Sequence, residues 1–373
     1  MVAAELIDPT GHRLTMLRTR LCELLRISHP IVCAPMGWIT GPELTAAVSR
    51  AGGLGILGAG AYPPELLRKK IRRVRELTDQ PFGVNLILSR PAEERFRVCV
   101  EERVPVLSLF WGDPAPFVER AHDAGMKVLL QVGDVASAVD AKAKGVDAII
   151  AQSVEAGGHV AGELSTMALV PRVVDAVAPV PVIAAGGIAD ARGLVAALAL
   201  GAQAAILGTR FIATPEADAH PGYKRRILAA SGDDTVRTTM FGGGWPDAPH
   251  RVLRTDFVEQ WLAKPERGNE NRADEPVVAE SRLGDEIFPI RRFMVFPPNR
   301  DTTGAVESMA LYAGQSAGLV REQKPAGKIV AQLNLFTLTS DQVKRLYLLN
   351  PQFALFVVHL IAKRLMADRA RTI

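Results

Sequence analysis

The residues with the clearest capacity for chemistry are a histidine and the glycines around it. The run Ala156-Gly157-Gly158-His159-Val160-Ala161-Gly162 places one imidazole on a segment that is rich in glycine. An imidazole titrates near neutral pH, so it can accept or donate a proton under physiological conditions. Glycines let the backbone bend closely around a flat ligand. An isolated histidine is more often a surface or core residue, but this setting predicts His159 as an acid/base residue.

Two further glycine sites could bind an anion. Gly186-Gly187 and Gly208-Thr209 each follow a short apolar run. Glycine lets backbone N–H groups approach a phosphate closely, and Thr209 adds a hydroxyl at the start of a predicted helix. One glycine pair would be weak evidence, since many turns need one. Two such sites after successive apolar runs indicate a phosphate site.

Short apolar runs alternate regularly with helical stretches along the chain, and these elements must position the candidate residues. The alternation favours parallel strands, because each helix returns the chain to the same end of the sheet. The runs are apolar at nearly every position, which indicates burial on both faces. The predicted strands are 31–34, 54–57, 82–87, 106–110, 127–132, 148–152, 182–185 and 204–207, and the predicted helices among them are 41–51, 64–78, 114–124, 135–144, 166–177 and 191–200.

The number of such repeats favours closure into an α/β (β/α)8 TIM barrel. A doubly wound open sheet is the alternative, but its GxGxxG loop would follow the first strand. The nearest glycine cluster lies at the second strand instead. In a barrel, catalytic groups lie at the carboxyl ends of the strands, and phosphate binds after strands seven and eight. The histidine follows the sixth predicted strand and the glycine sites follow the next two, so all three would meet at one end.

The rest of the chain is predicted to add three segments to a barrel that covers residues 25–218. Residues 219–300 are rich in Pro, Gly and charge and are predicted as an inserted, lid-like subdomain. Residues 301–330 are predicted to hold a barrel-closing helix. Residues 331–373 are predicted as a helical tail with one apolar stripe, which the barrel or a second subunit of a homodimer should cover.

Within these segments some local structure is also expected. Helices are predicted at 223–230 and 255–262, a polar loop at 266–286, and the barrel-closing helix at 303–319. Because the candidate site residues all precede the tail, removal of the tail is expected to leave cofactor binding and catalysis intact.

The composition excludes several classes of function. Hydrophobic residues make up 48% of the chain and charged residues 23%, as in ordinary globular proteins. A formal net charge of +4 gives no strong field for nucleic acid. The three cysteines lack a metal-binding spacing, so neither a metal nor a disulfide framework is expected. No signal peptide and no membrane-spanning stretch are recognisable, so we expect a cytoplasmic protein with no membrane partner.

Taken together and in order, these motifs resemble the nitronate monooxygenase (2-nitropropane dioxygenase) family. The resemblance covers roughly residues 25–330 and includes Tyr312-Ala313-Gly314-Gln315-Ser316-Ala317-Gly318. It implies FMN lying across the mouth of the barrel and His159 as the general base. At Cys33 and Gln131 the chain departs from residues that the family often carries. The positions that it implies for binding FMN are Pro35, Met36, Asn85, Gln131, Gln152, Gly157, Gly158, Gly186, Gly187, Gly208 and Thr209.

The reaction implied by the resemblance is oxidation of alkyl nitronates or nitroalkanes by dioxygen to a carbonyl compound and nitrite. Its partners would be a small-molecule substrate and dioxygen, with His159 taking the α-carbon proton of a neutral nitroalkane. An NAD(P)H-dependent flavin reductase of the same superfamily is the alternative, either a type II enoyl-acyl-carrier-protein reductase or a quinone reductase. A sensory or binding barrel without catalysis is a third. FMN rather than FAD is expected, because the glycine sites suit one terminal phosphate.

Overall fold

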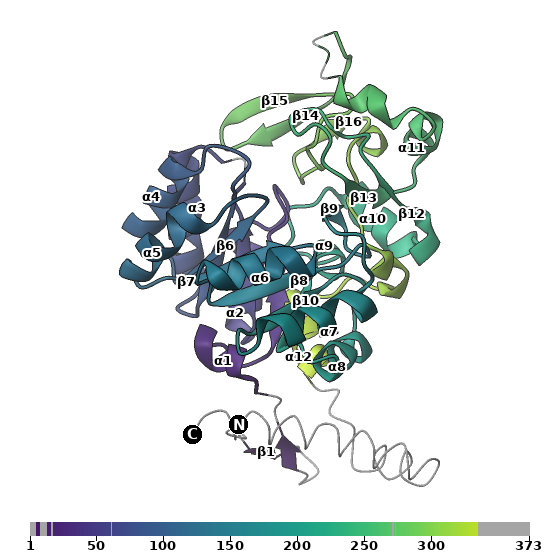
Figure 1. Ribbon diagram of the computed structural model, residues 1–373. Helices are drawn as coiled ribbons and strands as arrows, with labels where there is room; N and C mark the ends of the chain where they lie inside the picture. The colour runs from purple at the N-terminus through teal and green to yellow at the C-terminus, as the bar shows by residue number, and fades with distance from the viewer. Residues whose placement is uncertain are drawn as a thin grey trace, which may run out of the picture. The chain divides into compact units, whose positions relative to one another are not determined.

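The fold is a closed parallel barrel, seen in a computed structural model that describes residues 5–7, 13–15, 18–60, 62–270, 272 and 274–334 (Figure 1). The strands follow one another in the order β10-β11-β3-β4-β5-β6-β7-β8, and β11 pairs directly with β3. The predicted TIM barrel is therefore confirmed, and the open sheet is wrong. The strands are β3 (Ile31–Cys33), β4 (Leu54–Gly58), β5 (Phe82–Ile87), β6 (Val106–Phe110), β7 (Lys127–Val132), β8 (Ala148–Gln152), β10 (Val182–Ala185) and β11 (Ala204–Leu207).

Helices alternate with these strands and cover the outside of the barrel (Figure 1). Each predicted barrel helix is found within one residue at either end, and α4 lies in a stretch for which no helix was predicted. The helices are α2 (Pro42–Arg50), α3 (Pro64–Leu77), α4 (Glu93–Glu101), α5 (Ala115–Asp123), α6 (Val135–Ala143), α7 (Thr166–Val177) and α8 (Ala191–Ala199).

The interior of the barrel is a packed apolar core and α1 (Arg20–Leu25) contributes to it. Alternate strand residues such as Val32, Ile56 and Ile150 are fully buried and belong to one cluster with Leu21 of α1. The backbone N–H of Leu21 donates to Gln203 Oε1 at 3.0 Å, which ties α1 to the start of β11. A filled barrel of this kind offers no pore, so ligands must bind at its rim.

The segment after β11 belongs to the same compact unit as the barrel, residues 17–333, and the bounds of the inserted subdomain stay a prediction. The two predicted helices are confirmed as α10 and α11, but the predicted loop at 266–286 is partly wrong, because it contains most of a β-hairpin. The elements are α9 (Thr209–Ile212), α10 (Pro221–Ala229), β12 (Thr235–Thr238), β13 (His250–Leu253), α11 (Asp256–Trp261), β14 (Val277–Leu283), β15 (Glu286–Arg291), β16 (Thr303–Gly304) and α12 (Ala326–Asn334).

The predicted helix at 303–319 is wrong. This stretch contains β16 and two short 3-10 helices, Val306–Ser308 and Gln315–Leu319, joined by extended backbone. Its backbone groups pair with the insertion instead, since β16 pairs with β14 and Tyr312 forms a bridge with Val252. The next helix after this stretch is α12 (Ala326–Asn334), which crosses the expected boundary at residue 330.

Most of the predicted tail lies outside the described residues, so its helix and its covering surface stay predictions, as does the homodimer. Near the other terminus, β1 (Glu5–Ile7) and β2 (Arg13–Thr15) pair as a separate antiparallel sheet. None of the helices in the described ranges has the length and apolarity that a bilayer crossing requires.

Candidate active site

One cavity collects the whole predicted set of site residues. It has a volume of about 220 Å³ and lies at the carboxyl ends of the barrel strands. Its lining includes all twelve predicted residues, namely Pro35, Met36, Asn85, Gln131, Gln152, Gly157, Gly158, His159, Gly186, Gly187, Gly208 and Thr209. The strands bring these residues together because parallel strands place their carboxyl ends at the same rim.

His159 is held in place by the insertion as well as by the barrel. It forms, with Gly158, the short strand β9, which pairs antiparallel with β13 so that His159 lies opposite His250. On the barrel side, Gln152 Nε2 donates to the backbone oxygen of His159 at 3.0 Å. Gly158 has a φ of +75°, a conformation that favours glycine, which explains a glycine next to the histidine. The loop is therefore fixed between two elements.

The imidazole of His159 lies in an aromatic cluster made of Trp111, His159, Trp245, His250 and Tyr312. It stacks on Trp245, with ring centroids 4.2 Å apart and planes inclined by 19°. Trp111 meets it edge-on at 6.2 Å, and the rings of His250 and Tyr312 lie 5.4 and 5.5 Å away. These contacts restrict both the position and the plane of the imidazole.

This setting keeps the imidazole neutral at pH 7. Burial lowers the pKa of His159 well below its usual value, and the nearby His250 and Arg90 lower it further. Its Nε2 is enclosed and has no hydrogen-bond partner among the described residues. A buried polar atom without a partner is costly and is frequently found at functional sites. The geometry therefore presents an uncharged imidazole that can take up a proton.

His250, in contrast, is fully bonded to protein. The backbone N–H of Phe241 donates to His250 Nε2 at 3.2 Å, so Nδ1 carries the proton and donates to the oxygen of Ala248 at 2.9 Å. Burial lowers the pKa of His250 to about 4, so this ring is also neutral near pH 7. Its role is to position the cluster around His159.

The glycine sites lie on neighbouring strands, because β10 pairs with β11. Gly186 has a φ of +108°, and a side chain there would overlap Ser153 Oγ. A Cβ at Gly157 would lie 2.5 Å from the backbone nitrogen of Gly314, whose N–H donates to Thr209 Oγ1 at 2.9 Å. Close backbone approach therefore explains Gly157, and the positive φ together with the Ser153 side chain explains Gly186. The result is a cradle of small residues beside the cavity.

A wall of amide side chains also lines the cavity. Asn85 on β5 is held by its Nδ2, which donates to the oxygen of Ser108 at 3.0 Å. Gln152 on β8 is buried, and its Oε1 has no hydrogen-bond partner within the part of the chain that the structure describes. In the strand order, β5 lies across the barrel from β10. The cavity thus suits a planar ligand that carries N–H groups on its ring and a phosphate at the far end.

Several lining or neighbouring residues were not assigned a role from the sequence. Trp38 and Trp111 lie just after β3 and β6 with φ values of +64° and +59°, which are unusual for bulky residues. Arg90 and Trp245 line the cavity, and Tyr312 appeared only as part of a motif. The glycine run before Trp245 was the one local signal for it. In the described part of the chain no cluster of possible metal ligands is found.

Comparisons with known proteins agree with this geometry. A family model described as nitronate monooxygenase matches residues 18–96 and 91–335. The chain is 33% identical to a nitronate monooxygenase of Paraburkholderia phytofirmans, over 87% of this chain and 95% of that protein. It is 42% identical over 247 residues to a Mycobacterium tuberculosis protein named (3aS,4S,5R,7aS)-5-hydroxy-7a-methyl-1-oxo-octahydro-1H-indene-4-carboxyl-CoA dehydrogenase, covering 65% of this chain and 68% of that protein.

Two solved structures are similar along most of their length. FabK from Thermotoga maritima aligns with a TM-score of 0.70 and 41% identity, covering 85% of this chain and 94% of that chain. A nitroalkane oxidase from Streptomyces ansochromogenes aligns with a TM-score of 0.67 and 30% identity, covering 84% and 96%.

Proposed function

Since the chain belongs to the nitronate monooxygenase family, we propose that it oxidises alkyl nitronates or nitroalkanes with dioxygen to a carbonyl compound and nitrite. The observation that carries the proposal is the neutral, partnerless imidazole of His159 in the cavity that also holds the glycine sites. A nitroalkane has an acidic α-carbon hydrogen, and removing it needs a base of this kind.

The proposed cofactor is FMN, and the residues present fit it. The cradle around Gly186 and Gly208 suits a phosphate, while the free Oε1 of Gln152 can accept a hydrogen bond from a ring N–H. Asn85 and Gln131 offer further amide groups along the cavity wall. When bound, FMN would supply the redox chemistry, taking electrons from the substrate and passing them to dioxygen.

The protein's own part is to hold the substrate and move one proton. For a neutral nitroalkane, the proton passes from the α-carbon to a ring nitrogen of His159, and the imidazolium is then paired with the new nitronate anion. Trp245 keeps the imidazole plane fixed through stacking, and Gln152 fixes its backbone. A nitronate that is already deprotonated needs only to be bound and oriented. The aromatic cluster around the imidazole limits the approach of water.

The first experiment is to identify the flavin and the products of the purified protein. We expect FMN by mass analysis of the released cofactor, together with oxygen consumption and nitrite release when an alkyl nitronate is added. Release of FAD, or failure to bind any flavin on reconstitution, would contradict the cofactor assignment. A flavin-loaded protein that releases no nitrite from any nitronate would contradict the reaction.

A second candidate is a flavin-dependent dehydrogenase or reductase that uses NAD(P)H. It is favoured by the relative that is named as a dehydrogenase of a carboxyl-CoA compound. Mixing the flavin-loaded protein separately with NADH, NADPH and a nitronate, and following the visible absorbance of the flavin, separates the two. If only the nitronate reduces the flavin, the result supports the first proposal. If only NADH or NADPH reduces the flavin, the result supports the second.

A further inference from the structure

Arg90 carries a positive charge at the cavity and has no acidic partner in the described ranges of the chain. Its Nη2 donates to the backbone oxygen of Gly244 at 2.6 Å, and its guanidinium carbon lies 5.6 Å from the ring centroid of Trp245. No described Asp or Glu lies within 4.0 Å of it, whereas Arg68 and Arg72 on α3 both pair with Glu102. A backbone carbonyl and a ring face leave most of the guanidinium donors available.

The cavity around Arg90 contains no compensating charge. Among the described lining residues Arg90 is the single Lys, Arg, Asp or Glu, and the other residues are apolar or uncharged. Burial lowers the pKa of Arg90, yet an arginine stays protonated at all physiological pH values. Arg90 is partly buried, and withdrawing an unpaired charge even partly from water costs free energy, which an anionic ligand would offset.

The position of Arg90 separates it from the phosphate site. Arg90 follows β5, and the strand order places β5 across the barrel from β10, after which Gly186 and Gly187 lie. Trp245 contacts both the guanidinium of Arg90 and the imidazole of His159. An anion bound by Arg90 would therefore lie on the same side of the cavity as the acid/base residue, where the substrate must react.

We propose that Arg90 binds a planar, two-oxygen anionic group of the substrate and so makes the site selective for anionic over neutral substrates. The planar guanidinium fork matches such a group, which a nitronate or a carboxylate supplies. The inference deepens the proposed function and rests on it for the identity of the substrate. Arg90 thereby acts as a specificity-determining residue.

The test measures binding without turnover. Butyrate, an inert carboxylate of nitronate shape, and its neutral amide butyramide are titrated into the flavin-loaded protein by calorimetry, for the parent, Arg90→Gln and Arg90→Lys. We expect butyrate to bind Arg90→Gln at least tenfold more weakly than the parent, the scale of one lost charged hydrogen bond. Butyramide should bind all three alike, and Arg90→Lys should keep an intermediate affinity for butyrate.

Arg95→Gln is the matched control. Burial and the charge on Arg90 lower the pKa of Arg95, so the two side chains lie within electrostatic reach, but Arg95 Nη2 donates to the oxygen of Pro91 and Arg95 does not line the cavity. If loss of any nearby positive charge weakened butyrate binding, this variant would show it. We expect its affinity for butyrate to equal that of the parent.

Kinetics with two substrates identify which oxygens are bound. If the KM of a simple alkyl nitronate rises in Arg90→Gln, the nitronate group itself is bound. If the KM rises for a nitronate that carries a distal carboxylate and stays constant for the simple one, the carboxylate is bound.

Three results would overturn the inference. They are equal butyrate affinity in the parent and Arg90→Gln, no butyrate binding by the parent, and loss of FMN from both Arg90 variants, which would assign Arg90 to the cofactor. If butyrate binding depends on Arg90 but the protein releases no nitrite from alkyl nitronates, the inference about Arg90 is supported and the proposed reaction is contradicted. The two failures are therefore distinguishable.

Discussion

At His159, burial decides which form of the imidazole is present. Removal from water disfavours the charged ring, so its pKa falls and the neutral base dominates at pH 7. The same burial makes the imidazolium costly unless an anion forms beside it. Proton removal from a nitroalkane creates such an anion in the same step. The environment thus favours a base whose product is an ion pair.

Replacing His159 by Asn should leave flavin binding intact, because the imidazole is one of many residues that line the cavity. Turnover of a neutral nitroalkane should fall by about 100-fold, the scale of a lost general base. Turnover of the corresponding nitronate should fall less, because its proton is already removed. His122→Asn is the control, since His122 lies on α5 and pairs with Asp147 outside the cavity. Unchanged nitroalkane turnover in His159→Asn would exclude this residue as the base.

The pH dependence follows from the direction of the His159 shift. A base works in its neutral form, so kcat/KM for a neutral nitroalkane should fall as the pH drops through the pKa of His159. Because burial places that pKa below the usual value of 6.5, activity should persist below pH 6.5 and decline only at more acidic values. A pH profile of kcat/KM tests this. A midpoint at or above 6.5 would show that the imidazole is not desolvated in the working enzyme.

At the residue scale, the sequence predicts which residue acts as the acid/base group, but it does not predict which side chains surround that residue. The glycine loop predicted His159 because its residue types are local in the chain. The stacking partner Trp245 and the backbone partner His250 come from the insertion, and only the fold brings them to the imidazole. Arg90 could not be selected from the sequence among the many arginines, since its distinction is the lack of an acidic neighbour in space.

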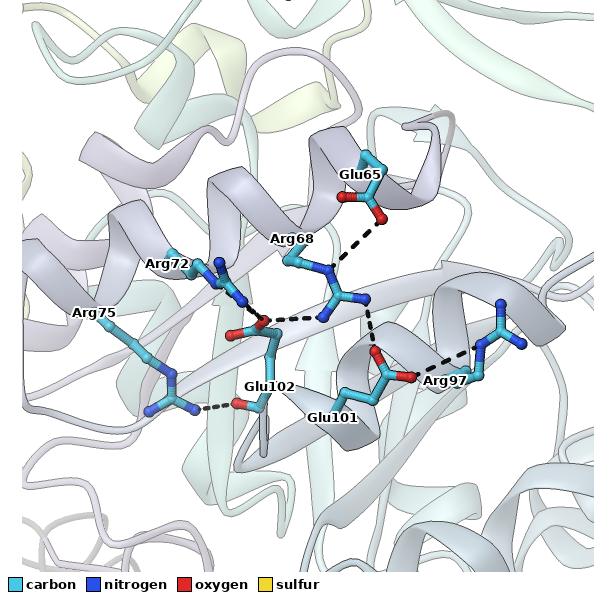
Figure 2. Close-up of polar contacts among 7 residues, drawn as sticks. All are labelled: Glu65, Arg68, Arg72, Arg75, Arg97, Glu101 and Glu102. Atoms are coloured by element: carbon cyan, nitrogen blue, oxygen red, sulfur yellow. Dashed lines mark hydrogen bonds and ion pairs between the residues drawn. The ribbon is translucent and has the colours of Figure 1, made fainter.

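At the scale of elements, the outer helices are joined by ion pairs. Figure 2 shows Arg68 and Arg72 of α3 converging on Glu102 at the end of α4. Glu102 accepts from Arg68 Nη1 at 3.0 Å and from Arg72 Nη2 at 2.8 Å, with a side chain 11% exposed. Its partial burial opposes ionisation, but the hydrogen bonds from Arg72 and Arg68 outweigh this and lower the pKa of Glu102. The neighbouring Glu101 is 46% exposed and also accepts from Arg68.

Glu102→Gln should lower the free energy of unfolding by about 1 kcal/mol, at the upper end for surface ion pairs, because it removes the charge that two arginines share. Glu101→Gln should have a smaller effect, since that carboxylate is more exposed to water. Urea denaturation of both variants and the parent measures the difference. Flavin content should not change in either variant, as neither residue lines the cavity. An equal decrease in the free energy of unfolding of both variants would show that pairing Glu102 with two arginines adds no stability.

The elements differ in how far the sequence predicts them. The barrel strands are buried on both faces, so their apolar runs mark them clearly, and their bounds are confirmed nearly to the residue. Helix α4 combines a charged exposed face with few buried residues, chiefly Phe96 and Cys99, and its apolar signal is weak. The hairpin β14–β15 and the stretch 303–319 depend on pairing partners distant in sequence, which no local pattern contains.

At the scale of the whole molecule, barrel and insertion build the cavity together. The strand ends supply the glycine sites and the amides, the insertion supplies Trp245, and the stretch 303–319 that follows it supplies Tyr312. Tyr223 of α10 is fully buried, and its hydroxyl donates to the backbone oxygen of Tyr312, which anchors one wall. The cavity is thus lined both by the barrel and by the segments that follow its last strand.

The described cavity-lining residues run from Ala34 to Ser316, and all of them precede α12. A chain ending at Asn334 should therefore keep flavin binding and turnover. A cut at residue 325 is the informative comparison, because it removes all of α12, including the buried Ile329, Val330 and Leu333. Each of these contributes about 1.5–3 kcal/mol when buried, so the shorter chain should unfold at a lower temperature or lose solubility. Thermal denaturation and flavin content of both chains measure this. A chain ending at Asn334 that folds well but loses FMN would show that residues 335–373 take part in the site.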